Sequence, residues 1–174
     1  MRIVRSVVAA AFALTLAVAG GSTASASSAG GLAGWTASGP GSAEVAKADK
    51  GARSMSYNYA QVGPEAGAWT MSKVAEESGP LALDWTIDGF HGFFRDAVRI
   101  TVFADGPGGR SSQQVLNIPG FPDEGPGTID GPFTFDGTAE VEITAGYAFG
   151  FIVEGSNFDC CSFLEGTLTV KERS

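Results

Sequence analysis

Apolar side chains recur at every second position along much of this chain, and this period constrains the fold more than any other feature. Leu81, Leu83, Trp85 and Ile87 alternate with small or polar residues. The same kind of alternation recurs in further segments, at residues 98–103, 140–144, 149–153 and 164–171. Successive side chains of an extended strand point to opposite faces, so the pattern predicts strands with one buried face.

Glycine- and proline-rich stretches separate these segments. They cover residues 78–80, 105–109, 119–127, 136–137 and 154–157. Glycine accepts positive φ angles and proline restricts φ, so both residues favour turns. Short strands with such turns, and no long amphipathic helix, predict an all-β chain: an antiparallel, jelly-roll-like β-sandwich of about eight or nine strands. A closed barrel is the alternative, because the strand pattern alone does not separate the two.

The N-terminal segment has the order of charged, apolar and small residues found in secretory signal peptides. Arg2 and Arg5 precede the apolar run 7–19, and residues 24–26 read A-S-A, which matches a cleavage site. We predict a signal peptide over residues 1–26 and a secreted, extracellular protein. The apolar run has 13 residues, fewer than the roughly 20 that a spanning helix needs, so we expect no membrane span after cleavage.

The next segment, residues 27–50, is rich in glycine, serine and alanine and has no apolar period. We expect a flexible leader there, with Trp35 as the first residue that packs and one or two helical turns over Glu44–Lys50. The folded domain is then predicted over residues 51–174.

The charge balance excludes one class of partner. The chain carries 11 Lys and Arg against 19 Asp and Glu, for a formal net charge of −8. A protein that binds the phosphate backbone needs a basic face, so nucleic acid is not an expected partner. A charge of this size favours a soluble monomer.

Two cysteines, Cys160 and Cys161, are adjacent in the sequence. In an exported protein a pair of thiols is a candidate disulfide, here a vicinal one that closes a strained ring and clips a loop. Two reduced thiols, bridges to other chains, and a redox or soft-metal role are the alternatives.

One short segment gathers aromatic, basic and imidazole side chains: Phe90, His91, Phe93, Phe94 and Arg95. It is a candidate binding platform for a sugar or peptide, with Arg95 and Asp88 orienting the ligand. The alternative is a connection between strands whose phenylalanines enter the core, because phenylalanine is usually buried. His91 would then be exposed or hydrogen-bonded to the backbone.

Acidic residues are numerous, but they match no known metal or catalytic pattern. Asp84 and Asp88 share one strand face about 13 Å apart, which is wide for glycosidase carboxylates at roughly 5–9.5 Å. The turn-rich segments hold candidate ligands for a structural calcium ion, although the EF-hand pattern is absent: Asp105, Asp123, Glu124, Asp130, Asp136 and Asp159. We assign no other metal or cofactor. Nucleophile-elbow, zinc-protease and phosphate-loop motifs are absent too, so we do not expect an enzyme.

The C-terminal half resembles a known group of sequences. Residues 139–170 read AEVEITAGYAFGFIVEGSNFDCCSFLEGTLTV, and the pattern AGYAFGF…GSNFD…LEGTLTV resembles small secreted actinobacterial proteins of unknown function. The TAG-Y-FGF step is more distantly similar to exported β-sandwich domains, including those of PEP-CTERM sorted proteins. The resemblance implies the fold and the extracellular address, and it transfers no catalytic residue.

These observations favour a secreted, non-catalytic binding or adhesion module of the cell envelope or extracellular space, with a glycan or another cell-surface component as its partner. One alternative is an extracellular hydrolase that acts on polysaccharide through carboxylates on separate strands. Another is a structural envelope protein without a small-molecule site.

Overall fold

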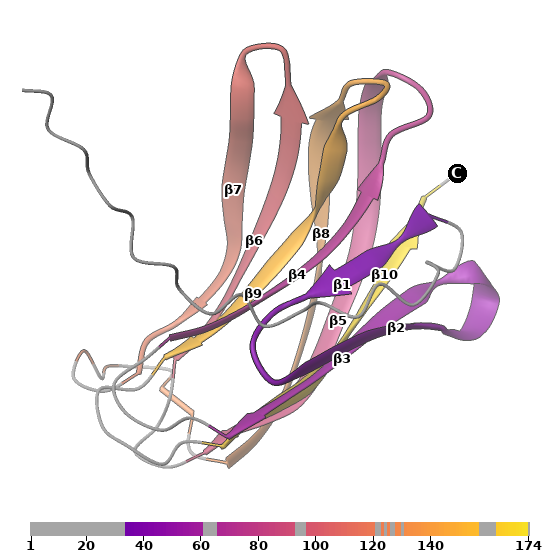
Figure 1. Cartoon of the computed structure of the whole chain (residues 1–174). Coiled ribbons are helices and arrows are strands. Elements are labelled where there is room, and N and C mark those ends of the chain that lie inside the picture. The colour runs from indigo at the N-terminus through magenta and orange to yellow at the C-terminus, as the bar shows by residue number, and fades with distance from the viewer. Residues whose placement is uncertain are drawn as a thin grey trace, which may run out of the picture.

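The computed structural model describes residues 34–60, 66–92, 97–120, 123, 125, 128–129, 131–156 and 163–173. Ten strands in these ranges form two antiparallel sheets (Figure 1). The strands are β1 (Thr36–Ser38), β2 (Ser42–Lys47), β3 (Arg53–Ala60), β4 (Ala66–Val74), β5 (Gly79–Gly92), β6 (Ala97–Gly106), β7 (Gly109–Ile118), β8 (Gly131–Ile143), β9 (Ala148–Ser156) and β10 (Phe163–Glu172).

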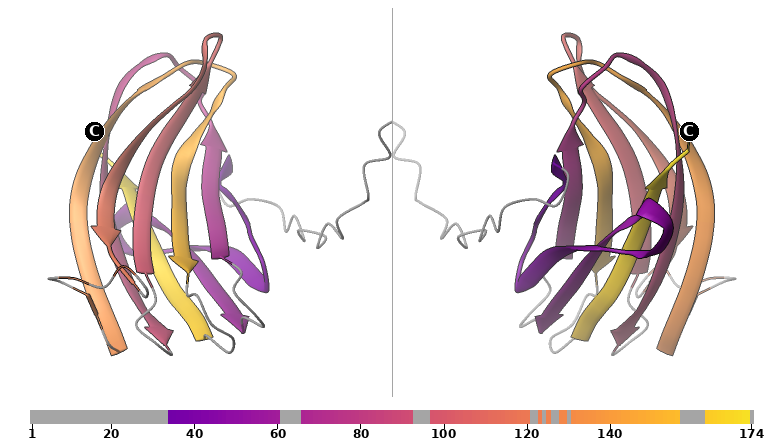
Figure 2. Two further views of the ribbon diagram at one scale, coloured as in Figure 1. Left: turned by 90° about the vertical axis from the view of Figure 1, so that its left-hand side faces the viewer. Right: turned by 90° about the vertical axis from the view of Figure 1, so that its right-hand side faces the viewer.

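The sheets have five strands each, and we name them sheet A and sheet B. Sheet A has the order β1-β4-β9-β6-β7, and sheet B has the order β2-β3-β10-β5-β8. Figure 2 shows the two layers from the side, with the curved strands of one sheet facing those of the other. The strands are divided between two separate sheets, so the predicted β-sandwich is confirmed and the closed barrel is not formed.

The core lies between the two sheets and is made by the side chains that the period of two predicts. Leu83, Trp85 and Ile87 of β5 are buried, whereas Asp88 on the opposite face is exposed. The matching positions of β6, β9 and β10 are buried in the same cluster: Val98, Ile100, Val102, Phe149, Phe151, Val153, Leu164, Leu168 and Val170. The alternation read from the sequence therefore identified the inner face of these strands correctly.

The expected flexible leader over residues 27–50 is corrected where the structure describes it. Thr36–Ser38 pairs with β4, Ser42–Lys47 pairs with β3, and Trp35 is 3% exposed. The helical turns expected over Glu44–Lys50 are not formed, since β2 runs to Lys47 and only a 3₁₀ turn follows at Asp49–Gly51. Both segments are edge strands, stabilised by main-chain hydrogen bonds to one neighbour, so they need no apolar period.

Two of the expected turns lie inside strands. Gly137 is in β8 opposite Trp85, and a Cβ atom there would lie 2.7 Å from the Trp85 ring. Gly155 is in β9, where a Cβ atom would lie 2.7 Å from His91 Cε1. Glycine at these positions makes room for a buried ring rather than for a turn, which is its other common use in a strand.

The N-terminal prediction cannot be followed in the structure, because residues 1–26 lie outside the described residues. Within the described part of the chain, no helix has the length and apolarity needed to cross a membrane.

Candidate functional site: a polar groove on the outer face of sheet B

The outer face of sheet B presents hydrogen-bonding side chains in rows that cross the strands. The pairing registers align one row from β2 to β8: Glu44, Ser56, Thr167, Asp88 and Thr134. They align a second row beside it: Ser42, Asn58, Glu165, Phe90 and Pro132. Neighbouring strands lie about 4.8 Å apart, so each row repeats its side chains at that spacing.

Contacts within each row hold several of these side chains in place. Asn58 Nδ2 donates to Glu165 Oε2 at 3.3 Å, and the Thr134 hydroxyl donates to Asp88 Oδ1 at 2.7 Å. The hydroxyls of Ser56 and Thr167 are 3.1 Å apart, within hydrogen-bond distance. A carboxylate accepts up to about four hydrogen bonds, so the groups oriented in this way still have capacity for a ligand.

The two rows border a groove with a volume of about 570 Å³. It is lined by residues of four strands: Ser42, Glu44, Ser56, Tyr57, Asn58, Asp88, Gly89, Glu165, Gly166 and Thr167. The floor is a pair of glycines that face each other, Gly89 of β5 and Gly166 of β10. A Cβ atom on Gly166 would lie 2.5 Å from the Tyr57 hydroxyl, and one on Gly89 would lie 2.8 Å from Phe133 Cζ. The glycine pair therefore lets two core rings pack directly beneath the groove.

Under this floor lies a buried pair of polar side chains. His91 Nδ1 is 3.0 Å from the Ala97 carbonyl, which can only accept, so Nδ1 carries the hydrogen. Nε2 is therefore the acceptor, and the Tyr57 hydroxyl donates to it at 2.8 Å. Tyr57 also stacks on Trp69, with ring centroids 4.2 Å apart, and the Trp69 indole donates to the Pro40 carbonyl at 2.9 Å. The pair is rigid and fully hydrogen-bonded.

Burial decides the protonation of this pair. Desolvation lowers the pKa of His91 to about 4, against a smaller opposing effect of its hydrogen bond to Ala97. Desolvation also raises the pKa of Tyr57 far above its usual range, and the negative charge of Glu165 adds to that effect. At neutral pH the imidazole is therefore neutral and the phenol is protonated, as the hydrogen bond between them requires.

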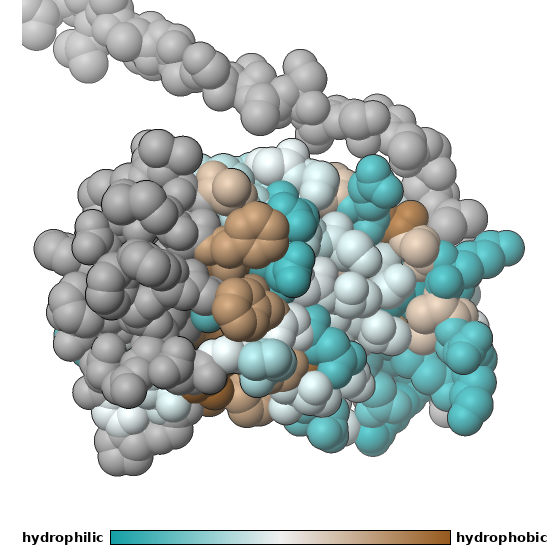
Figure 3. Space-filling model, turned by 90° about the horizontal axis from the view of Figure 1, so that it is seen from below, coloured by the Kyte–Doolittle hydropathy of each residue, from teal (hydrophilic) through white to brown (hydrophobic). Residues whose placement is uncertain are grey.

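Two phenylalanines extend the groove at the end where β10 begins. Phe90 lies in the second row next to Glu165, and Phe163 starts the following row, opposite Gly92 and Ala60. Both alternate with buried neighbours, His91 and Leu164, and so point outward; Phe90 is half-buried and Phe163 is 42% exposed. On the face seen in Figure 3, brown apolar side chains lie directly beside teal hydrophilic ones. The strand pairing itself places Phe90 next to Glu165 and Phe163 in the following row, so the two rings continue the polar rows along the sheet.

The predicted binding residues lie in different environments: one is on the outer face, one is in the core, and the others lie outside the described residues. Phe90 is half-buried and lies on the outer face, beside the groove. His91 has no exposed surface, so it is corrected from a binding residue to a core residue, because the alternation along β5 turns it inward. Its predicted hydrogen bond to the backbone is formed with Ala97. Phe93, Phe94, Arg95 and the pair Cys160 and Cys161 lie outside the described residues.

The predicted calcium ligands do not converge where the structure describes them. Asp105 is held by Arg110, at 2.7 and 3.0 Å, and Asp136 is exposed within β8. Asp123 is exposed, while Glu124, Asp130 and Asp159 lie outside the described residues. In the part of the chain that is described, no cluster of three or more His, Cys, Asp or Glu side chains could hold a metal ion.

Sequence reasoning missed Phe163, the polar rows and their glycine floor. Phe163 lies two residues after Cys161, so the sequence did not separate it from the predicted loop. The serines and threonines of the two rows belong to no sequence motif. The spacing of Leu164, Gly166 and Leu168 was the available signal, since a glycine at an inward position marks a close approach of another group.

The chain is similar to solved structures, but not to a known protein family or a curated protein. No protein-family model matches the chain, and no curated protein is similar to it. Among solved structures it is similar to TmCBM61, a carbohydrate-binding module in complex with β-1,4-galactotriose, with 13% identity and a TM-score of 0.40. The match covers 80% of this chain and 88% of that one.

Proposed function

We propose that this chain is a secreted, non-catalytic glycan-binding module and that the groove on sheet B, together with Phe90 and Phe163, is its binding surface. The observation that carries the proposal is the continuity of two ordered polar rows with two outward phenylalanines. A saccharide offers hydroxyl groups at its edges and C–H groups on its ring faces. Fixed carboxylate, amide and hydroxyl groups satisfy the first, and aromatic rings pack against the second.

The charge of the groove points to the class of glycan. Glu44, Asp88 and Glu165 line it, and no lysine or arginine does so among the described residues. An anionic saccharide would meet like charge on every side, which disfavours binding. A neutral polysaccharide is therefore the expected ligand of this groove, which is expected to reject uronic-acid polymers.

We expect Phe163→Ala to weaken binding of a neutral polysaccharide roughly 3- to 10-fold, the usual worth of one aromatic packing contact. Tyr147→Ala is the matched control, because Tyr147 is 39% exposed against 42% for Phe163 but lies in the turn between β8 and β9, away from the groove. Affinity electrophoresis of the mature protein in gels containing xylan, galactan or soluble cellulose, with polygalacturonate as the anionic arm, measures the effect. Equal retardation of both variants in every gel would contradict the proposed surface.

One observation favours the alternative of a polysaccharide hydrolase. Asp88 and Glu165 both line the groove, on neighbouring strands and diagonally opposed. Diagonal neighbours in a sheet are roughly 7–8 Å apart, which falls within the roughly 5–9.5 Å of glycosidase carboxylates. Against this, Asp88 is exposed on an open sheet face, whereas a general acid usually needs shelter from water.

The two functions predict different products. With a binding module, prolonged incubation with each retained polysaccharide releases no reducing ends above the protein-free blank. Release that disappears in both Asp88→Asn and Glu165→Gln, but persists in Asp84→Asn, would establish the hydrolase instead. Asp84 is the control because it lies on the same face of β5 but is bound to Arg173 outside the groove.

A further inference from the structure

Basic side chains gather in a second pocket, at the end of the sandwich away from Phe163. It has a volume of about 300 Å³ and is lined by Trp35, Lys50, Gly51, Arg53, Lys73, Val170, Lys171 and Glu172. Of the 11 Lys and Arg residues, three lie outside the described residues, and four of the other eight line this pocket. In a chain with a net charge of −8, such a concentration of positive charge needs a reason.

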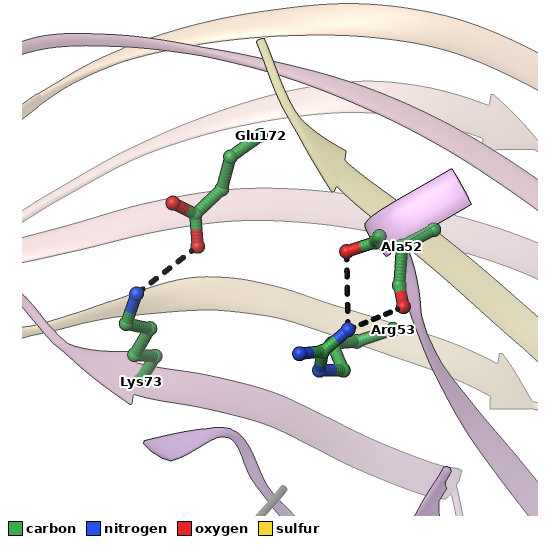
Figure 4. Close-up of polar contacts among 5 residues, drawn as sticks. Ala52, Arg53, Lys73 and Glu172 are labelled. Carbon is green, nitrogen blue, oxygen red and sulfur yellow. Dashed lines mark hydrogen bonds and ion pairs between the residues drawn. The ribbon is translucent and has the colours of Figure 1, made fainter. Parts of the chain in front are cut away.

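Two of the four cations occupy inward positions at the ends of strands. Arg53 shares the face of Met55 and Tyr57 on β3, and Lys73 shares the face of Trp69 and Met71 on β4. Lys73 Nζ lies 3.2 Å from Glu172 Oε1, so this ion pair joins sheet A to sheet B (Figure 4). Among the described residues, Glu172 is the one acid that lines the pocket, and Lys73 already balances its charge.

Arg53 is fixed in place but incompletely hydrogen-bonded. Its Nη1 donates to the carbonyls of Gly51 at 3.1 Å and Ala52 at 2.8 Å, which holds the guanidinium group (Figure 4). Its Nε is buried and has no hydrogen-bond partner in the described part of the chain. A buried N–H of a cation without an acceptor is costly, so the positive charge of Arg53 is incompletely compensated by the described residues.

Two further lysines add charge at the rim. Lys50 and Lys171 are exposed, and neither forms an ion pair or hydrogen bond with the described residues. The nearest competing acid for Lys171 is Asp84, whose pKa is lowered by its hydrogen bond with Arg173 and also by Lys171. Arg173 is hydrogen-bonded to this carboxylate at 2.7 Å, and Lys171 lies beside Asp84 in the pairing of β10 with β5.

From the four basic residues that line this pocket, and from the Arg53 guanidinium that the Gly51 and Ala52 carbonyls hold there, we propose that the pocket binds an oxyanion group, either free or carried on a saccharide. Phosphate, sulfate and carboxylate share the required chemistry. The Arg53 guanidinium supplies positive charge at the pocket wall, and Lys50 and Lys171 supply charge-assisted hydrogen bonds from the rim. The site is independent of the groove on sheet B, whose acidic lining would repel the same ligand.

Isothermal titration of the mature protein tests this site, with inorganic phosphate, sulfate or acetate replacing chloride at constant ionic strength. We expect saturable binding of at least one oxyanion. Glucose 6-phosphate and glucose form the second arm: tighter binding of glucose 6-phosphate than of phosphate assigns a saccharide-borne group, and equal binding assigns the free ion. No saturable binding of any of these anions would overturn the proposal.

The variant Lys50→Gln/Lys171→Gln is expected to weaken oxyanion binding roughly tenfold, because it removes two cationic donors. Both residues are exposed, so the fold should be unaffected. Lys47→Gln is the control: it removes one positive charge three residues from Lys50, on an exposed side chain that does not line the pocket. Unchanged binding in the double variant, or an equal loss in the control, would show that the effect is not local and would overturn the assignment.

Discussion

Acidification from pH 7 to pH 4 is expected to destabilise this protein by about 3 kcal/mol through His91 alone. Burial lowers the pKa of His91 in the folded state from 6.5 to about 4. Well above pH 6.5 the imidazole is neutral in both states and contributes no pH dependence. Between pH 6.5 and pH 4 the unfolded chain binds a proton that the folded chain does not, so the free energy of unfolding falls as the pH falls. Protonation would also place a hydrogen on Nε2, so the Tyr57 hydroxyl 2.8 Å away could no longer donate to it and would have to turn and accept.

Urea unfolding of the wild type and of His91→Gln at several pH values isolates this contribution. Asp84 and Asp105, whose pKa values are lowered by Arg173 and Arg110, also lose stabilisation in acid, but they do so in both proteins. We therefore expect the difference in unfolding free energy between the two proteins to shrink by about 3 kcal/mol from pH 7 to pH 4. Parallel pH profiles would show that His91 is not buried in its neutral form.

Gly150→Ala is expected to destabilise the fold by at least about 3 kcal/mol. Gly150 lies in the middle of β9 between Ser72 of β4 and Phe103 of β6, with φ at +158°. A Cβ atom in this conformation would overlap the Met71 carbonyl oxygen and lie 2.8 Å from Ser72 Cα. These are backbone atoms of the neighbouring strand, so the overlap can be removed only if β4 and β9 separate.

Two other glycines serve as controls for this substitution. Gly109 has φ at +101° and no atom near its Cβ position, so Gly109→Ala should show the backbone strain alone, about 1–2 kcal/mol. Gly108 has an open Cβ position and no positive φ, so Gly108→Ala should stay within about 0.5 kcal/mol of the wild type. Urea midpoints at pH 7 give the order. A smaller loss for Gly150→Ala than for Gly109→Ala would contradict the close packing of β4 against β9.

Phe103 shows that the alternation of side chains predicts the sheet face on which a residue lies better than it predicts how deeply that residue is buried. The period of two places it on the outer face of β6, opposite Val102, and the structure agrees. It is nevertheless only 1% exposed, and the Arg110 guanidinium lies 4.0 Å from its ring centroid while Asp105 holds the same guanidinium. A side chain from the next strand covers the ring, and no local pattern in β6 reveals that cover.

The edge strands β1 and β2 show the opposite case, because their local sequence does not indicate an extended strand. Thr36–Ser38 and Ser42–Lys47 have small and polar side chains, so nothing marks them as extended. Their conformation comes from main-chain hydrogen bonds to β4 and β3. Trp35 was the one residue there whose burial could be foreseen, because a large aromatic side chain strongly favours the core.

The sequence by itself determined the all-β class and the inward faces of β5, β6, β9 and β10, because the period of two is a local property of an extended chain. Only the tertiary structure decided which polar residues share a surface. Ser56 and Thr167 are 111 positions apart, yet they meet in one row. Arg53 and Lys73 meet Glu172 in one pocket in the same way. Register between distant strands creates both sites, and register depends on how two sheets pack rather than on any single segment.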